Sequence, residues 1–285
     1  MGNSEVIMKP LPIMSWEHWP QAWQSFDLTD YHHGCLSGAA AHAWLTQALR
    51  QRNPLSLCNL SDGDIAVWVY HELLTVPEIQ VEWIQKLADT NGISRLEDRF
   101  LWPLLDVCCQ QTSAWLVQDH WDIAARLSYC CMTLKGVEIR PEGFWYHGQQ
   151  KQKVDCEAVY SFAQQGHLLP AIKGRRVAVL GGLHEPLTES LRASGVNVVV
   201  SCAFPRSVHA PKLPAVPHIL ETLFHEDWDL LLCSTGGYSP LFCDFAAQQG
   251  RQGFDIGSAD SILITGKRFH AQFQNQTDVR KNPVQ

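Results

Sequence analysis

The last third of the chain alternates continuous apolar runs with segments whose apolar residues recur every three or four positions. The continuous runs lie at 174–182, 196–204, 229–237 and 253–257, and they predict buried strands. The segments between them predict helices. Strands and helices that alternate at these lengths are typical of a parallel sheet with helices on both faces.

Small or acidic residues come at the ends of three of these predicted strands. Strands that run the same way all end at one edge of the sheet, and ligands of such sheets bind outside that carboxyl edge. The sequence therefore predicts one shared edge for Gly181, Gly182, Gly236, Gly237 and Asp255.

The earlier part of the chain divides less sharply. Apolar residues at helical spacing over 15–26 and 37–52 predict an N-terminal helical cap, which we place at residues 1–52. We expect one α/β domain over residues 53–268, with a largely parallel sheet flanked by helices. The remaining residues, 269–285, are polar and predict a loose tail.

Strand-like and helix-like segments also alternate through the middle of the chain. A strand is predicted at 54–60, followed directly by a helix that begins at Asp62. The helix predicted over 95–110 contains Pro103, which removes a backbone hydrogen bond and predicts a kink or break there. A further helix is predicted over 154–169.

Composition and charge exclude several classes of protein. Apolar residues make up 46% of the 285 residues, which is enough for a sizeable core. The formal net charge is -7 and no long run of Lys or Arg occurs, so nucleic acid is not expected as the main partner. No stretch approaches the ~20 apolar residues of a membrane span. The first residues lack the basic start of a signal peptide.

The ten cysteines have neither the C-x-x-C pattern nor the Cys/His spacing of a zinc finger. Together with the missing secretory signal, this predicts buried reduced thiols in a cytoplasmic protein. The group formed by His32, His33 and Cys35 is a weaker alternative, a metal site in a polar loop.

The stretch NLSDGD, residues 59–64, places two acids around one glycine where the strand passes into the helix. In one interpretation Asp62 caps the helix and Asp64 lies in its first turn, where negative charge is favoured. In the other, Asp62 and Asp64 hold Mg²⁺ or Mn²⁺, which prefer hard oxygen ligands and take one or two carboxylates beside substrate phosphates. Local sequence alone leaves both interpretations open.

The stretch VAVLGG, residues 177–182, is also open to two interpretations. It departs from G-x-G-x-x-G, so the dinucleotide fingerprint fails. It fits the glycine loop of an S-adenosylmethionine methyltransferase, but the next strand, residues 196–204, has no acid at its end to hold a ribose. The alternative is a glycine pair that simply lets the chain turn tightly.

Taken together, these motifs resemble the GT-D-fold glycosyltransferases over roughly residues 53–262. That family has an early R-[FI]-G-D-G-E turn and a late D-I-G-H-[IL]-D segment. NLSDGD matches the early turn at Asp62 and Gly63, with Asp64 in place of Glu. FDIGSAD, residues 254–260, matches the late segment, with Ser in place of His at 258; the matching residues are Asp255, Ile256, Gly257 and Asp260.

The resemblance implies transfer of a sugar from a nucleoside diphosphate sugar, such as a UDP-sugar, to an unknown glycan, protein or lipid-linked acceptor. It implies that Asp62 and Asp64 hold Mn²⁺ or Mg²⁺ and that Asp255 and Asp260 orient the donor or serve as a base. The donor-binding positions are the glycines of the turns: Gly63, Gly181, Gly182, Gly236 and Gly237.

Two other functions remain as alternatives to a transferase. One is a nucleotide-sugar-binding protein without turnover, and the other is the methyltransferase suggested by the VAVLGG turn. Whether or not the protein turns over a substrate, Asp62, Asp64 and Asp255 are expected to line one cleft, because their strands end on one edge of a parallel sheet. The turns at 181–182 and 236–237 are expected on the rim of that cleft.

Overall fold

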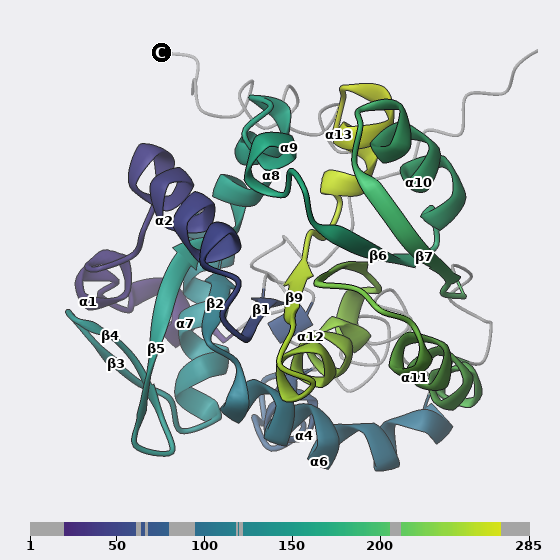
Figure 1. Cartoon of the computed structure of the whole chain (residues 1–285). Helices are drawn as coiled ribbons and strands as arrows, with labels where there is room; N and C mark the ends of the chain where they lie inside the picture. The colour runs from purple at the N-terminus through teal and green to yellow at the C-terminus, as the bar shows by residue number, and fades with distance from the viewer. Residues whose placement is uncertain are drawn as a thin grey trace, which may run out of the picture.

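The computed structural model describes residues 20–60, 64–65, 68–79, 95–117, 119, 122–205 and 212–268. They form a nine-stranded sheet with helices on both faces (Figure 1). The strand order is β3-β4-β5-β2-β1-β9-β8-β6-β7. The strands are β1 (Leu55–Leu60), β2 (Ala114–Val117), β3 (Glu138–Arg140), β4 (Gly143–Tyr146), β5 (Gln149–Asp155), β6 (Arg176–Gly181), β7 (Asn197–Ala203), β8 (Leu230–Ser234) and β9 (Gln252–Asp255).

Helices connect these strands and cover the sheet. The α-helices are α1 (Thr29–His32), α2 (Gly38–Gln51), α4 (Tyr70–Leu73), α6 (Arg95–Gln111), α7 (Asp122–Leu134), α8 (Cys156–Gln164), α9 (Leu168–Ala171), α10 (His184–Ala193), α11 (Val216–His225), α12 (Ser239–Gln248) and α13 (Ala259–Thr265). The short 3-10 helices are η3 (Gln21–Ser25), η4 (Leu213–Ala215) and η5 (Gly236–Tyr238).

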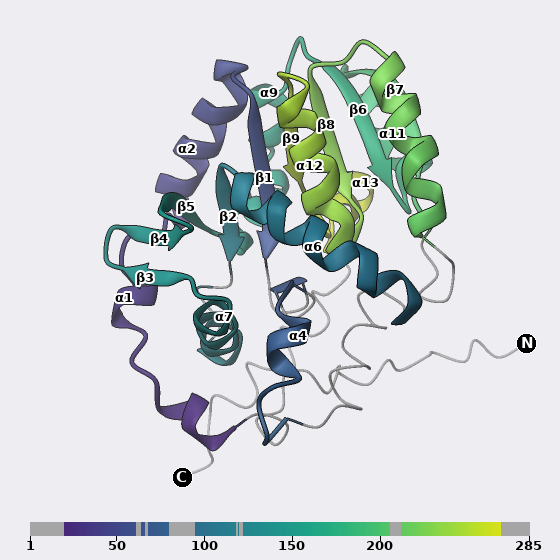
Figure 2. The same cartoon turned by 90° about the horizontal axis from the view of Figure 1, so that it is seen from below.

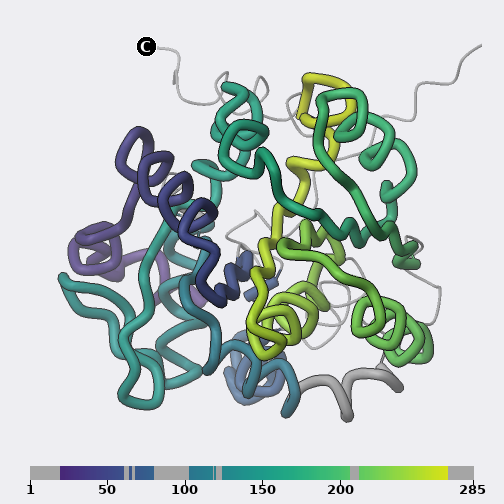
Figure 3. Tube along the Cα trace, viewed as in Figure 1, coloured from purple at the N-terminus to yellow at the C-terminus, as the bar shows by residue number. Residues whose placement is uncertain are grey.

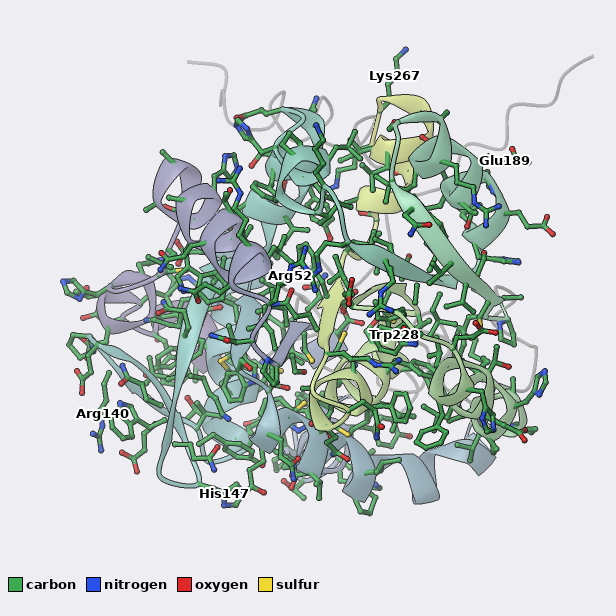
Figure 4. The ribbon with its side chains drawn as sticks, viewed as in Figure 1. Arg52, Arg140, His147, Glu189, Trp228 and Lys267 are labelled. Atoms are coloured by element: carbon green, nitrogen blue, oxygen red, sulfur yellow. The ribbon has the colours of Figure 1, made fainter. Side chains whose placement is uncertain are left out.

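The expected α/β class with a largely parallel sheet is confirmed. From β5 across to β7 every neighbouring pair of strands is parallel, and antiparallel pairing is confined to β3, β4 and β5. The antiparallel strands β3 and β4 form one side of the molecule, where Figure 4 labels Arg140 and His147. Glu189 of α10 and Lys267 after α13 lie toward the other side (Figure 4).

Side chains alternate between the two faces of the central strands and so build separate cores. Val177 and Val179 of β6 pack with residues of α2, α8, α9, α10 and α13. Ala178 and Leu180 pack on the opposite face, with residues of α6, α11 and α12. This period of two explains why strands that are buried on both faces read as continuous apolar runs in the sequence.

A third core lies under the first half of the sheet. Trp115 of β2 and Phe144 of β4 pack there with α7 and with residues near α1 and α4. Seen from below, the strand arrows point toward the side of the molecule that holds α1, α4 and α7 (Figure 2). The carboxyl edge of the sheet therefore faces these three helices.

The predicted helix over 154–169 begins later than expected, because residues 149–155 form β5. Asp155 ends this strand and caps α8, accepting a hydrogen bond from the backbone N–H of Glu157 at 3.1 Å. The polar sequence QQKQKVD does not predict a buried strand, because two of its buried side chains are lysines, Lys151 and Lys153. Their ammonium groups bond to backbone carbonyls instead of water, which makes the burial tolerable.

The break expected at Pro103 does not occur, since α6 continues from Arg95 to Gln111 with Pro103 inside it. A proline inside a helix removes one backbone hydrogen bond, and packing of α6 against α12 offsets that loss. Among the described residues, no helix has the length and apolar character that crossing a membrane requires.

Candidate functional site

At two places in the sheet, the helices that follow two adjacent strands lie on opposite faces of the sheet. After β1 the chain continues to α4 and α6, whereas after β9 it enters α13 on the other face. After β6 it enters α10, whereas after β8 it enters α12 on the opposite face. Ligands of α/β sheets bind where the connections diverge in this way, at the carboxyl ends of the strands. The two divergent pairs therefore define the candidate site.

Asp255 joins the ends of β9 and β1 directly. Its Oδ2 accepts a hydrogen bond from the backbone N–H of Asn59 at 3.1 Å, although the two residues are 196 positions apart in the chain. Its Oδ1 accepts from the backbone N–H of Gly257 at 3.0 Å. The traces of β1 and β9 lie side by side at the centre of Figure 3, as their parallel pairing requires.

The Asp255 side chain is shielded from solvent, with 2% of the residue exposed. Burial raises the pKa of Asp255 to about 7, and the N–H groups of Gly257 and Asn59 oppose that shift without cancelling it. The Asp255 carboxyl group thus links the ends of β9 and β1 by hydrogen bonds, a connection called the joint below. Its charge also changes near neutral pH.

Gly257 of the late motif allows a close approach behind this joint. It has a φ of 49°, and a Cβ atom there would lie 2.9 Å from Tyr160 Oη and 3.1 Å from Asn59 Nδ2. The Asn59 amide donates to Tyr160 Oη at 3.4 Å. The guanidinium of Arg268 lies 3.7 Å from the centroid of the Tyr160 ring. A larger residue than glycine at 257 would displace this packing.

Asp260 meets the end of the other divergent pair. Ser234, the last residue of β8, donates its hydroxyl to Asp260 Oδ2 at 2.9 Å, and its Oγ also lies 2.9 Å from the carbonyl oxygen of Gly257. Gly181 is paired with Ser234, and a Cβ on Gly181 would lie 3.0 Å from the Ser234 carbonyl oxygen. The late motif therefore connects β9 with both β1 and β8.

The predicted glycine turns lie where their strands end. Gly181 closes β6, and Gly182 follows it in a partly buried turn. Gly236 opens η5 after β8 with a φ of 56°, a left-handed conformation that favours glycine, and Gly237 beside it is buried. These turns lie at the same edge as Asp255, and a donor-binding role for them stays a prediction.

The structure describes one of the two predicted metal ligands. Asp64 is partly buried at the start of a helical stretch, whereas Asp62 and Gly63 lie outside the described residues. The cleft predicted for Asp62, Asp64 and Asp255 therefore stays a prediction. Within the described ranges, no cluster of three or more His, Cys, Asp or Glu side chains is suited to a metal ion.

The weaker metal alternative in the first fifty residues has other partners. His32 Nδ1 lies 2.9 Å from Asp119 Oδ1, and His33 Nδ1 lies 3.1 Å from the carbonyl oxygen of Pro141. The Cys35 thiol is directed at the carbonyl oxygen of Leu36, 3.9 Å away. All ten cysteines are free thiols, and nine of them are buried.

A hollow of about 600 Å³ lies away from this edge, along the outer surface of α2. Its walls include His42, Thr46, Arg50 and His167, and none of the residues predicted from the sequence belongs to it. The carboxyl edge remains the better candidate, because it combines divergent connections with buried polar groups, whereas the hollow is an open surface feature.

Comparison with protein families bears on the late motif. Residues 137–263 match the family model of the GT-D fold-like domain. The chain carries a GT-D-like domain. No curated protein and no solved structure matches the chain.

The matched range places the late motif inside the GT-D-like domain and the early turn before it. The range contains β3 to β9, and with them Asp255, Asp260 and the glycine turns after β6 and β8. It begins after β1, the SDGD turn and β2, so the match supports the resemblance over β3 to β9 and does not cover the early turn. The hydrogen bond from Asn59 to Asp255 connects the GT-D-like domain to β1.

Several polar residues at the carboxyl edge were not predicted from the sequence. Tyr160 accepts a hydrogen bond from Asn59, and Ser234 donates one to Asp260 of the late motif. Asp119 lies two residues after β2, and Asp155 is the last residue of β5. An acid two residues after a predicted strand was the available signal for Asp119, whereas Asp155 had none because β5 was not predicted. Tyr160 had none, since it reads as one more apolar residue of a helix face.

Proposed function

We propose that the chain is a metal-dependent glycosyltransferase that moves a sugar from a nucleoside diphosphate sugar to an unknown acceptor. The observation that carries this proposal is the joint between Asp255 and Asn59. It connects the late motif of the GT-D-like domain to β1, the strand that directly precedes the SDGD turn. The divergence of the connections after β1 and β9 supports a ligand site at the same place.

The two acids of the SDGD turn fit a divalent metal in their chemistry. Mg²⁺ and Mn²⁺ take carboxylate oxygens and complete their shell with water and substrate phosphates, so two acids suffice. Asp62 and Asp64 would hold the ion, which would neutralise charge on the leaving diphosphate. Asp255 is less suited as a ligand, because both of its oxygens already accept backbone hydrogen bonds.

The contacts of the two late aspartates favour orienting roles over proton transfer. Asp255 is buried and spans β9 and β1, so it holds the strand end that leads into the SDGD turn. Asp260 accepts from Ser234 and from the backbone N–H of Ser261 at 2.6 Å. In the proposed enzyme these aspartates position the turns around the donor, and the acceptor proton goes to another group.

A thermal-shift experiment tests the proposal. A ligand that binds only the native state raises the free energy of unfolding, by about 2.7 kcal/mol when its concentration is one hundred times its Kd. The melting temperature rises as a result. UDP and a panel of common nucleoside diphosphate sugars should therefore raise the melting temperature by several degrees with Mn²⁺ and much less with EDTA. No metal-dependent shift with any member of the panel would contradict the proposed function.

Two variants separate metal binding from simple helix capping. Asn caps a helix about as well as Asp, so Asp62→Asn should leave the melting temperature of the metal-free protein nearly unchanged under either interpretation. If Asp62 and Asp64 hold the metal, Asp62→Asn and Asp64→Asn should each lose the shift produced by UDP with Mn²⁺. A full shift in both variants would rule out the metal role.

The same screen distinguishes the two alternative functions. Donor binding without release of UDP would indicate a binding protein without turnover. A shift with S-adenosylmethionine but with no nucleotide sugar would indicate a methyltransferase. The structure favours the transferase over the latter, since β7 ends at Ala203 and is followed by Phe204, with no carboxylate there to hold a ribose.

A further inference from the structure

A histidine and an aspartate form a close pair beside the candidate site. His32 Nδ1 lies 2.9 Å from Asp119 Oδ1. When the carboxylate accepts this bond, Nδ1 carries the hydrogen, and in the neutral imidazole that leaves Nε2 with its lone pair. The His32 side chain is 43% exposed, and Nε2 has no hydrogen-bond partner within the described part of the chain.

The backbone around His32 is held rigidly. The ammonium group of the buried Lys153 donates to the carbonyl oxygens of Asp30 at 3.0 Å and Tyr31 at 2.9 Å, and also to that of His33. Tyr31 is fully buried, and its ring packs 5.6 Å from that of Phe144. The backbone at the end of α1 is therefore anchored on both sides of His32, which fixes the position from which the His32 side chain extends.

The pair lies at the carboxyl edge of the sheet. Asp119 comes two residues after β2, whose last residue, Val117, is paired with Leu60 at the end of β1. The N–H of Asp155, which ends β5, donates to the carbonyl oxygen of Leu36, so the segment after α1 lies against the end of β5. Figure 2 shows α1 on the side toward which the strands point.

We propose that His32 is the general base that activates the acceptor, and that Asp119 is the residue that positions it. This inference rests on the proposed transferase function. His32 Nε2 takes the proton of the acceptor hydroxyl as its oxygen forms a bond to the anomeric carbon of the donor sugar. The bond from that carbon to the diphosphate oxygen breaks, and the nucleoside diphosphate leaves with the electron pair.

The arrangement has the features that general-base catalysis requires. A base is most effective when a third group fixes its tautomer and orientation, and here Asp119 supplies that group. The Asp119 side chain is 17% exposed, so it is more shielded from water than its partner. The His32 side chain is partly open to solvent, so an acceptor hydroxyl can approach it.

The chain offers a matched control in the next residue. His33 lies on the same turn and is also exposed, but its Nδ1 contacts the backbone carbonyl of Pro141 instead of a carboxylate. The experiment compares His32→Gln with His33→Gln by measuring UDP release from UDP-glucose, UDP-galactose and UDP-N-acetylglucosamine with Mn²⁺, with water as the acceptor. The melting shift with UDP and Mn²⁺ measures donor binding in the same samples.

His32→Gln should lower the rate of UDP release by about 100-fold or more, while the UDP shift stays unchanged. His33→Gln should keep both. If His32→Gln releases UDP at the wild-type rate, the base role is overturned and the proposed function still stands. The same holds if His33→Gln loses as much UDP release as His32→Gln does. A wild-type protein that neither binds nor cleaves any of these donors would overturn both proposals.

A spectroscopic measurement tests the role of Asp119. In the wild type, ¹⁵N–¹H correlation spectra of His32 should show a proton fixed on Nδ1 at neutral pH. Asp119→Asn removes the carboxylate, so the proton should redistribute toward Nε2, and UDP release should fall in parallel. An unchanged His32 tautomer in Asp119→Asn would contradict the positioning role.

Discussion

Asp255 and Asp119 lie at the ends of the two strands that neighbour β1, but their surroundings differ. Asp255 follows one neighbour of β1 and is buried, with both oxygens bonded to backbone N–H groups. Asp119 follows the other neighbour and bonds to the partly exposed side chain of His32. Both residues come after parallel strands and lie at the same edge of the sheet.

The difference shows that position at the carboxyl edge is not enough to assign a role. A buried carboxylate that satisfies two backbone donors stabilises the site, because losing it would leave those donors unpaired. A carboxylate that holds an exposed histidine contributes little to stability and can control proton transfer. The partners of each aspartate, rather than its place after a strand, separate the two roles.

The largest effect that follows from this comparison is on stability. Asp255→Ala leaves the buried N–H of Asn59 and the N–H of Gly257 without their acceptor, which should lower the free energy of unfolding by about 3 kcal/mol. Urea denaturation of both proteins measures the change. Asp227→Ala is the control, since the Asp227 side chain is 77% exposed and should contribute under about 1 kcal/mol. Equal stability of Asp255→Ala and the wild type would show that the joint is not structural.

A second, smaller effect is the dependence of stability on pH. The pKa of Asp255 is raised from 3.8 to about 7 in the folded protein, chiefly by burial. Between those two pH values the folded state holds the proton more tightly than the unfolded state does. The contribution of Asp255 to stability is therefore greatest below pH ~4 and is lost as pH rises toward 7, by at most ~1.4 kcal/mol per pH unit.

Asp255→Asn isolates that dependence, because Asn does not titrate and keeps one oxygen acceptor. The stability of the variant relative to the wild type should rise as pH rises from about 4 to about 7. Urea denaturation at several pH values across this window gives the slope. A relative stability that does not rise over this window would mean that the backbone N–H groups, not burial, dominate the pKa of Asp255, since a lowered pKa moves the dependence below pH ~4.

The same contrast explains what could be predicted from the sequence. Strands β6, β8 and β9 are buried on both faces and have glycine or aspartate at or shortly after their ends, so both their existence and their shared edge were predictable. Strand β5 was not, because Lys151 and Lys153 give it a polar sequence although both are buried. Helix C-terminal carbonyls satisfy these ammonium groups, and that compensation exists only after folding.

The candidate site divides in the same way. Asp255 was predictable because it belongs to a continuous motif after a strand. The pairing of His32 with Asp119 was not, because the two residues are 87 positions apart and neither stands in a recognisable motif. The position of His32 also depends on Lys153, a third residue far from both in the chain.

The smallest predicted effect is on the stability of the outer pair. Even a fully charged pair at the surface contributes only about 0.2–1 kcal/mol, so Asp119→Ala and His32→Gln should each lower the free energy of unfolding by roughly 0.5 kcal/mol. A double-mutant cycle from urea denaturation measures their coupling, which should also stay below about 1 kcal/mol. If Asp119→Ala costs as much as Asp255→Ala, Asp119 is a second structural joint and the contrast disappears. A small coupling together with a large loss of UDP release in His32→Gln would place the function of the pair in chemistry, since an interaction that adds little to the folded state can then matter only in the reaction.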